Sequence, residues 1–332
     1  MPAETLNPAL PGIQEIQSLT TTEMAAVNDL IRERLSSEVA LINQISEHII
    51  AAGGKRLRPM LAAIAARALG HSGNEPTQLA AIIEFIHTAT LLHDDVVDES
   101  NLRRGRKTAN AIWGNAPSVL VGDFLYSRAF QMMVTGESMR VMQIMADATN
   151  KIAEGEVLQL LNINDPDVTV DRYTQVIEFK TAKLFEAAAQ VAAVLAGADT
   201  ATEQALAQFG RKLGSAFQLI DDVLDYEGDA ALTGKNVGDD LREGKVTMPL
   251  IHVATVGSNA QKALVREAIE AGGTDQFAAI FAAINATGAL AATRALAAQQ
   301  ANAASAALTI LPDSEAKKLL LYLCELAVDR DR

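Results

Sequence analysis

Two aspartate clusters, far apart in the chain, share one pattern of spacing. The clusters are Asp94-Asp95-Val96-Val97-Asp98 and Asp221-Asp222-Val223-Leu224-Asp225. Each follows an apolar, helix-favouring stretch, at 80–92 and at 213–220. At positions i, i+1 and i+4 of a helix, the first and third carboxylates share a face and the second lies about 100° around it. Clustered carboxylates are costly to bury unpaired, whereas Mg²⁺ binds them together with substrate phosphates. A solvated helix end would explain one cluster, but two copies predict paired metal-binding faces.

Positive charge gathers in two short segments of an otherwise acidic chain. The formal net charge is −13, from 28 Lys and Arg against 41 Asp and Glu. Three of the cations lie in Gly-Gly-Lys-Arg-Leu-Arg-Pro at 53–59 and four in Arg-Arg-Gly-Arg-Lys at 103–107. Solvated loops would be the ordinary explanation. However, glycines free the backbone and guanidinium groups match phosphate oxygens, and the second segment begins five residues after Asp98, so we favour anion binding.

Composition limits the class of protein. The acidic balance argues against nucleic acid as a partner. A single cysteine, Cys324, excludes a disulfide within the chain, and we expect it in the core of the last helix. No run of 18 apolar residues occurs, and the N-terminus does not resemble a signal or transit peptide. We therefore expect a soluble, cytoplasmic protein.

The same composition predicts an all-α fold. Ala, Leu, Ile, Glu and Gln dominate, strand-type alternation is scarce, and 49% hydrophobic residues provide a large core. Residues 1–21, with three prolines, are expected to form a flexible arm, and 22–332 one helical domain without a dividing linker. The glycine-rich segment 228–246 is expected to be a mobile loop. Helical spacing predicts helices near 24–50, 59–70, 77–99, 117–135, 138–163, 170–197, 201–227, 258–271, 274–287, 289–309 and 313–329.

Taken together, the motifs resemble those of the trans-polyprenyl diphosphate synthases, the chain-elongating isoprenyl transferases. The resemblance is carried by the two aspartate clusters, the segments 53–59, 103–104 and 155–160, Lys180-Thr181, Phe217-Gln218-Leu219-Ile220 and Gly234-Lys235. Segments 84–93 and 122–124 further resemble bacterial members that make the octaprenyl chain of ubiquinone. The resemblance implies a single-domain helical bundle of the isoprenoid-synthase type with a central active-site cavity, assembled as a homodimer.

The implied reaction is Mg²⁺-dependent prenyl transfer. An allylic diphosphate, farnesyl diphosphate by expectation, loses pyrophosphate, and the double bond of isopentenyl diphosphate attacks the resulting cation. Catalysis should be electrostatic because a departing trianion must be neutralised. The released pyrophosphate is the expected proton acceptor, since no side chain is an obvious base. Three Mg²⁺ ions are expected on Asp94, Asp98 and Asp221, with Asp95, Asp222 and Asp225 as direct ligands or as supports of the ligands.

The resemblance also assigns a separate set of binding side chains to each of the two diphosphates. Isopentenyl diphosphate is assigned to Lys55, Arg58, His87 and Arg104. The allylic diphosphate is assigned to Arg103 and to the catalytic residues Lys180, Thr181, Gln218 and Lys235. His87 lies two helical turns before Asp94, and Gln218 lies one turn before Asp221, which favours ligand roles over core packing. Glu156 and Gln159 lie one helical turn apart. This spacing fits a role in the active site and equally well a structural role, in which the two side chains cap or bridge helices.

The growing chain must run from the first aspartate cluster into the bundle. Thr90 lies one turn before Asp94 and Ala89 lies beside it. In short-chain relatives an aromatic residue at one of these positions closes the tunnel, so two small side chains predict a long product. Met133 and Met145 are candidates for the tunnel floor, with gap-filling core residues as an equal alternative. The expected product is octaprenyl diphosphate, with heptaprenyl, nonaprenyl and decaprenyl products as neighbours.

Two other functions deserve comparison with this one. A class I terpene cyclase also ionises a diphosphate between helices, but it needs no second diphosphate site, and its second metal motif mixes Asn, Ser and Glu. A non-catalytic synthase subunit would lack the metal aspartates, and none is missing here. The expected partners are therefore the two diphosphates and a second copy of the chain, with allowance for transient membrane contact at product release.

Overall fold

The computed structural model describes residues 16, 18–227, 238–272 and 276–329. These residues form an all-α structure with one short antiparallel hairpin, β1 (Leu102–Arg103) and β2 (Arg106–Lys107), which confirms the predicted class. The helices are α2 (Thr21–Leu35), α3 (Ala40–Ala51), α4 (Leu57–Ala68), α5 (Glu75–Val97), α6 (Ala109–Trp113), α7 (Asn115–Thr135), α8 (Met139–Asn162), α9 (Val170–Ile177), η1 (Glu178–Ala182), α10 (Lys183–Leu195), α11 (Thr200–Glu227), α13 (Asp239–Arg242), α14 (Met248–Val256), α15 (Asn259–Ala271), α16 (Phe277–Thr287), α17 (Ala289–Ala307), η2 (Leu308–Ile310) and α18 (Glu315–Val328).

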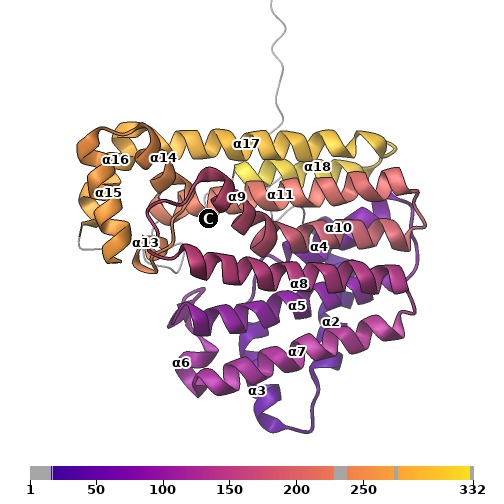
Figure 1. Cartoon of the computed structure of the whole chain (residues 1–332). Coiled ribbons are helices and arrows are strands. Elements are labelled where there is room, and N and C mark those ends of the chain that lie inside the picture. The colour runs from indigo at the N-terminus through magenta and orange to yellow at the C-terminus, as the bar shows by residue number, and fades with distance from the viewer. Residues whose placement is uncertain (1–15, 17, 228–237, 273–275, 330–332) are drawn as a thin grey trace, which may run out of the picture.

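The long helices stack into one bundle around α10 (Figure 1). Helix α10 packs against α4, α5, α8 and α11. Apolar side chains cover most of its circumference, apart from a stripe of Lys183, Glu186 and Gln190, and five fully buried alanines allow neighbours to approach. Helices α14, α15 and α16 gather at one end of the bundle (Figure 1), over a second core that includes Val223, Leu250, Val265 and Ile280.

The N-terminal region differs from the sequence prediction in one respect. The helix predicted for 24–50 is two helices, α2 and α3, separated by 36–39. Asn43 closes this break, because its Oδ1 accepts from the Ser37 N–H at 3.0 Å and its Nδ2 donates to the Ser37 carbonyl at 2.8 Å. Ile16 and Thr20 are buried, with the Thr20 hydroxyl donating to the Ile16 carbonyl at 2.9 Å. The arm–domain boundary at residue 21 stays a prediction.

Three further differences lie nearer the cavity. The helix predicted for 170–197 passes through the π-helical turn η1. In the segment predicted as a loop, 239–242 form α13, while 228–237 lie outside the described residues. Helix α14 was not predicted, and its Pro249 is tolerated because it stands in the first turn.

Two smaller predictions can be compared directly with the structure. Cys324 is buried in α18, as expected. Within the described ranges, no single helix has the length and apolarity needed to cross a membrane, and only α16 with the helical segment 289–310, bent by 61°, passes that test as a pair.

Candidate active site

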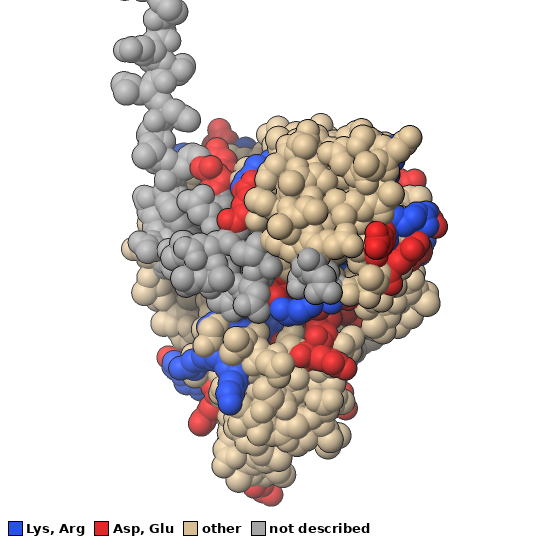
Figure 2. Space-filling view, turned by 90° about the vertical axis from the view of Figure 1, so that its left-hand side faces the viewer, with Lys and Arg blue, Asp and Glu red and all other residues tan. Residues whose placement is uncertain are grey.

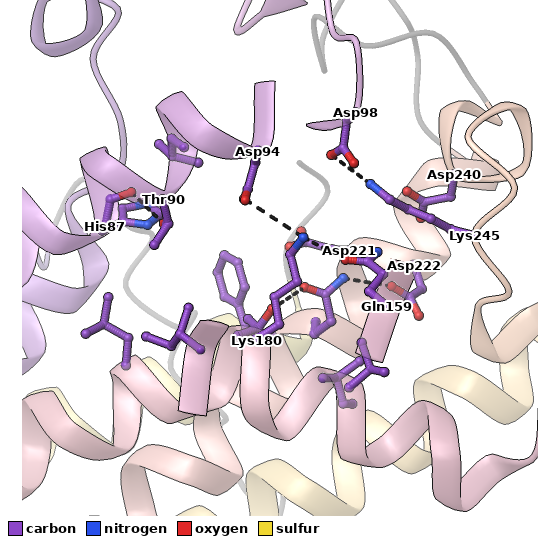
Figure 3. A pocket seen from close by; sticks show the side chains of 18 of the residues that line it. His87, Thr90, Asp94, Asp98, Gln159, Lys180, Asp221, Asp222, Asp240 and Lys245 are labelled. Carbon is purple, nitrogen blue, oxygen red and sulfur yellow. Dashed lines mark hydrogen bonds and ion pairs between the residues drawn. The ribbon is translucent and has the colours of Figure 1, made fainter. Parts of the chain in front are cut away.

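Both aspartate clusters reach one cavity of about 650 Å³. Asp94 lines it from α5 and Asp98 from the C-cap of that helix, and Asp221, Asp222 and Asp225 line it from α11. Figure 3 shows Asp94 and Asp98 on one side and Asp221 and Asp222 facing them from another helix. Figure 2, which views the end of the molecule where α15 and α16 lie, shows acidic and basic side chains meeting in a hollow of that face.

Asp95 points away from the other acidic residues of its cluster. It is fully buried and absent from the cavity wall, and its Oδ1 accepts from Arg103 Nε at 2.8 Å and Nη2 at 2.7 Å. Burial raises the pKa of Asp95, and the Arg103 charge opposes that shift. The i, i+1, i+4 spacing therefore separates two faces, with Asp94 and Asp98 on the cavity and Asp95 holding Arg103.

The β1–β2 hairpin aims two neighbouring arginines in different directions. Arg104 and Gly105 form its two-residue turn, with φ of 53° and 74°. Arg103 turns towards Asp95, whereas the Arg104 guanidinium lies against Gly54, where a Cβ would come 2.7 Å from Arg104 Nη1. Both arginines line the cavity, so a tight turn supplies two separate cations to it.

The predicted isopentenyl diphosphate residues Lys55, Arg58, His87 and Arg104 all line the cavity. The Arg58 guanidinium stacks 4.3 Å from the Phe185 ring centroid, and its Nη1 lies 3.4 Å from His87 Nε2. Burial lowers the Arg58 pKa to about 10, with Glu84 opposing that shift. Burial and the nearby arginines lower the His87 pKa well below its ordinary value. His87 is therefore a neutral hydrogen-bonding group at pH 7.

Lys180 is held at the cavity wall by α8. Its Nζ donates to Glu156 Oε2 and Gln159 Oε1, both at 2.6 Å, and lies 4.0 Å from Asp94 Oδ2 (Figure 3). Burial, followed by the Asp94 charge, raises the Glu156 pKa to about 7. Glu156 and Gln159, whose role the sequence left open, therefore fix the position of Lys180.

A chain of hydrogen bonds continues from Thr181. The Thr181 hydroxyl donates to Gln218 Oε1 at 3.0 Å, and Gln218 Nε2 donates to Asp222 Oδ1 at 2.9 Å. Tyr173 donates its hydroxyl to Asp222 Oδ2 at 2.5 Å. Burial and then Asp240 raise the Asp222 pKa to about 7. This chain joins the second aspartate cluster to the π turn.

Sequence reasoning missed several residues of this cavity. Lys245 pairs with Asp98 Oδ2 at 2.9 Å and Glu243 Oε2 at 2.7 Å. Burial opposes its charge, but Asp98, Asp240 and Glu243 raise its pKa. The Arg56–Glu84 pair and Tyr173 were also missed. Glu84 does lie on α5, three helical turns before Asp95, but the contacts of these residues join segments far apart in the chain, so only the fold reveals them.

The remaining predicted residues fall into three groups. Lys235 lies outside the described residues. Thr90 lines the cavity and donates its hydroxyl to the His87 carbonyl at 2.9 Å. Ala89, Met133 and Met145 are buried and are not part of the wall. Their roles in product length stay predictions.

The carboxylates of the cavity fit Mg²⁺ as an open site. Among the described residues, no group of three acidic, histidine or cysteine side chains converges as a closed metal site would require. The donors from α5 and α11 are all hard oxygens on two walls. Such a set suits an ion that completes its shell with substrate phosphate oxygens.

The comparisons agree with this geometry. The family model described as polyprenyl synthetase matches residues 39–286. The chain therefore belongs to the polyprenyl synthetase family, and it is a prenyltransferase of the Mg²⁺-dependent type typical of that family. The fold class and the family expected from the motifs are both confirmed.

Individual relatives cover nearly the whole chain. It is 54% identical to octaprenyl diphosphate synthase from Escherichia coli (strain K12), over 97% of this chain and 100% of the relative. It is 47% identical to the geranyl-diphosphate-specific all-trans-nonaprenyl-diphosphate synthase of Rhodobacter capsulatus, over 96% and 98%. The crystal structure of polyprenyl synthase from Caulobacter crescentus CB15, complexed with calcium and isoprenyl diphosphate, superposes with a TM-score of 0.94 at 46% identity, over 97% and 99%.

Proposed function

We propose that this prenyltransferase extends farnesyl diphosphate with isopentenyl diphosphate and releases octaprenyl diphosphate for the ubiquinone side chain. One observation carries the proposal: two aspartate walls and a separate cationic cluster share one cavity. The aspartates supply one diphosphate site through metal ions. The cluster of Lys55, Arg58 and Arg104, with neutral His87, supplies a second site that needs no metal.

The aspartates would hold three Mg²⁺ ions. Asp94, Asp98 and Asp221 are the proposed ligands, with Asp222 and Asp225 as further oxygens on the same wall. When bound, these ions supply the positive charge that a departing pyrophosphate requires. Asp95 serves differently, because it orients the Arg103 guanidinium towards the allylic diphosphate.

Lys180, Thr181 and Gln218 occupy the wall between the aspartate clusters. Lys180 holds the leaving group from a position that Glu156 and Gln159 fix. The oxygens of Thr181 and Gln218 stabilise the allylic cation, and their mutual hydrogen bond orients them before the reaction. Lys235 would complete the allylic site. The departing pyrophosphate then accepts the proton that the elongated product loses.

The product assignment is supported by likeness to relatives. The octaprenyl diphosphate synthases of E. coli and Haemophilus influenzae are 54% and 52% identical to the chain, against 47% for the nonaprenyl-forming relative. The test is incubation with farnesyl diphosphate, isopentenyl diphosphate and Mg²⁺, followed by chromatography of the dephosphorylated products. An octaprenyl alcohol is expected. A different chain length would overturn the product assignment alone, and absence of condensation would overturn the reaction.

We also propose a homodimer, with transient membrane contact at product release. Support for the dimer comes from exposed apolar side chains on α7 and α8, which are Val119, Leu120, Val134, Met139, Val157, Leu160 and Leu161. Apolar surface of this kind marks association sites. Light scattering should give a dimer, and a stable 35.3 kDa particle at micromolar concentration would contradict it. Product-dependent flotation of the protein with vesicles would test the membrane contact.

A further inference from the structure

The π-helical turn η1 lies between two helices that approach it unusually closely. The turn spans Glu178–Ala182 and carries Lys180 and Thr181 into the cavity wall. Helix α8 contacts it on one side and α11 on another. Single π turns inside α-helices occur often at functional sites, because they re-aim side chains that a regular helix would place elsewhere. A turn of this kind must be fixed by its neighbours.

Helix α8 approaches η1 through Gly155. A Cβ at this position would lie 2.5 Å from the Lys180 amide nitrogen and 3.0 Å from Lys180 Cα. Since these are backbone atoms, no side chain can turn aside to make room. A glycine inside a helix lowers its stability relative to alanine, so the close backbone contact is the physical reason for Gly155.

Helix α11 approaches the same turn through Gly214. A Cβ there would lie 2.6 Å from Ala182 Cα and 3.0 Å from Ala182 Cβ. The two glycines therefore meet one short segment at its middle residue, Lys180, and at its last residue, Ala182. Together they fix how deeply η1 lies between α8 and α11.

Each glycine stands one helical turn before a glutamine that binds η1. Gln159 follows Gly155 by four residues and accepts from Lys180 Nζ at 2.6 Å. Gln218 follows Gly214 by four residues and accepts from the Thr181 hydroxyl at 3.0 Å. Residues at i and i+4 share a helix face, so each helix presents a backbone contact and an amide contact to the turn. Moving either helix outward would lengthen the corresponding hydrogen bond.

We propose that Gly155 and Gly214 are positioning residues for prenyl transfer, which set the place of Lys180 and Thr181 by allowing α8 and α11 to touch the backbone of η1. The inference rests on the roles given to Lys180 and Thr181 in the proposed function. It adds that these roles depend on two residues with no side chain, neither of which contacts substrate.

The experiment compares Gly155→Ala and Gly214→Ala with a matched control, Gly210→Ala. Gly210 lies one turn before Gly214 on α11, and a Cβ there would lie 2.3 Å from the Phe185 carbonyl oxygen of α10. The control therefore inserts the same methyl group into an equally tight contact of the same helix, but against the α10 backbone at Phe185 and Glu186 and not against η1. Turnover with farnesyl and isopentenyl diphosphates, KM for isopentenyl diphosphate and melting temperature are measured for each, with Lys180→Ala in parallel.

The expected result is a fall in kcat of at least about tenfold for Gly155→Ala and Gly214→Ala, with KM for isopentenyl diphosphate within about twofold of wild type, since a displaced catalytic group costs on this order. Gly210→Ala should keep its kcat whatever its melting temperature. Normal kcat in both η1 variants would overturn the inference. So would an equal loss in Gly210→Ala, or failure of both η1 variants to fold while Gly210→Ala folds. Lys180→Ala distinguishes a failure of the positioning role of the glycines from a failure of the proposed function. Normal turnover in Lys180→Ala would overturn the role proposed for Lys180 itself.

Discussion

At the residue scale, the cavity is built from charged groups whose partners are already in place. Asp95 holds Arg103, Glu156 and Gln159 hold Lys180, and Asp222 is held by Gln218 and Tyr173. Groups that are fixed before the substrates bind need little reorganisation as charge develops, which is the main source of electrostatic catalysis. The neutral His87 among arginines belongs to the same arrangement.

His87 should make the stability of the protein depend on pH. Its folded-state pKa is depressed by burial and then by Arg58, Arg104, Arg103 and Arg56. The unfolded chain therefore binds a proton that the folded protein does not bind. This favours unfolding as pH falls below the ordinary histidine pKa of about 6.5. The melting temperature of wild type should fall more between pH 7 and 5 than that of His87→Gln, and identical profiles would contradict a neutral buried His87.

At the element scale, the hairpin and the helix ends decide which groups meet. Regular helices such as α5, α8 and α11 could be predicted because their apolar spacing persists over many turns. The helix faces on which the aspartates lie could be predicted from the same helical spacing. The break before α3 could not be predicted because it depends on Asn43 closing a turn. Helix α14 was missed because its 9 residues are too uniformly apolar to show helical spacing, although Pro249 in its first turn is an ordinary helix-start signal. Lys245 also escaped prediction, since only tertiary packing brings it to Asp98.

The hairpin predicts a division of labour between Arg103 and Arg104. Because their side chains diverge towards Asp95 and Gly54, Arg104→Ala should raise KM mainly for isopentenyl diphosphate and Arg103→Ala mainly for the allylic diphosphate. Losing a charge-assisted contact worth about 2 kcal/mol should raise the KM of the affected substrate roughly 30-fold. Steady-state kinetics with each substrate varied in turn makes the comparison. Equal effects of each variant on both substrates would argue that the loop serves one anion site.

At the scale of the whole molecule, an acidic chain concentrates cations around one cavity. The net charge is −13, yet Lys55, Arg58, Arg103, Arg104, Lys180 and Lys245 all line it. A terpene cyclase would need no second anion site, and a non-catalytic subunit would not keep the metal aspartates. Family membership and the full-length likeness to octaprenyl diphosphate synthases agree with an enzyme that binds two diphosphates.

Product length should be set where the chain leaves the aspartates. Thr90 lines the cavity one turn before Asp94, with buried Ala89 beside it. Thr90→Phe or Ala89→Tyr should shorten the product while condensation continues, because an aromatic ring fills the path of the tail. Met133→Ala or Met145→Ala should lengthen it if either residue forms the floor. Chromatography of dephosphorylated products decides, and unchanged length in both aromatic variants would mean that the tail takes another path.

The central claim is that the two aspartate walls act on one metal-bound diphosphate. The most direct measurement is kcat for Asp94→Ala, Asp221→Ala and the double variant at saturating Mg²⁺, with circular dichroism confirming the helical fold. Each single substitution should lower kcat by at least about 10²–10³-fold. The double variant should lose much less than the product of the two effects, because residues that act as a unit are not additive. Near-normal turnover in either single variant would contradict the claim.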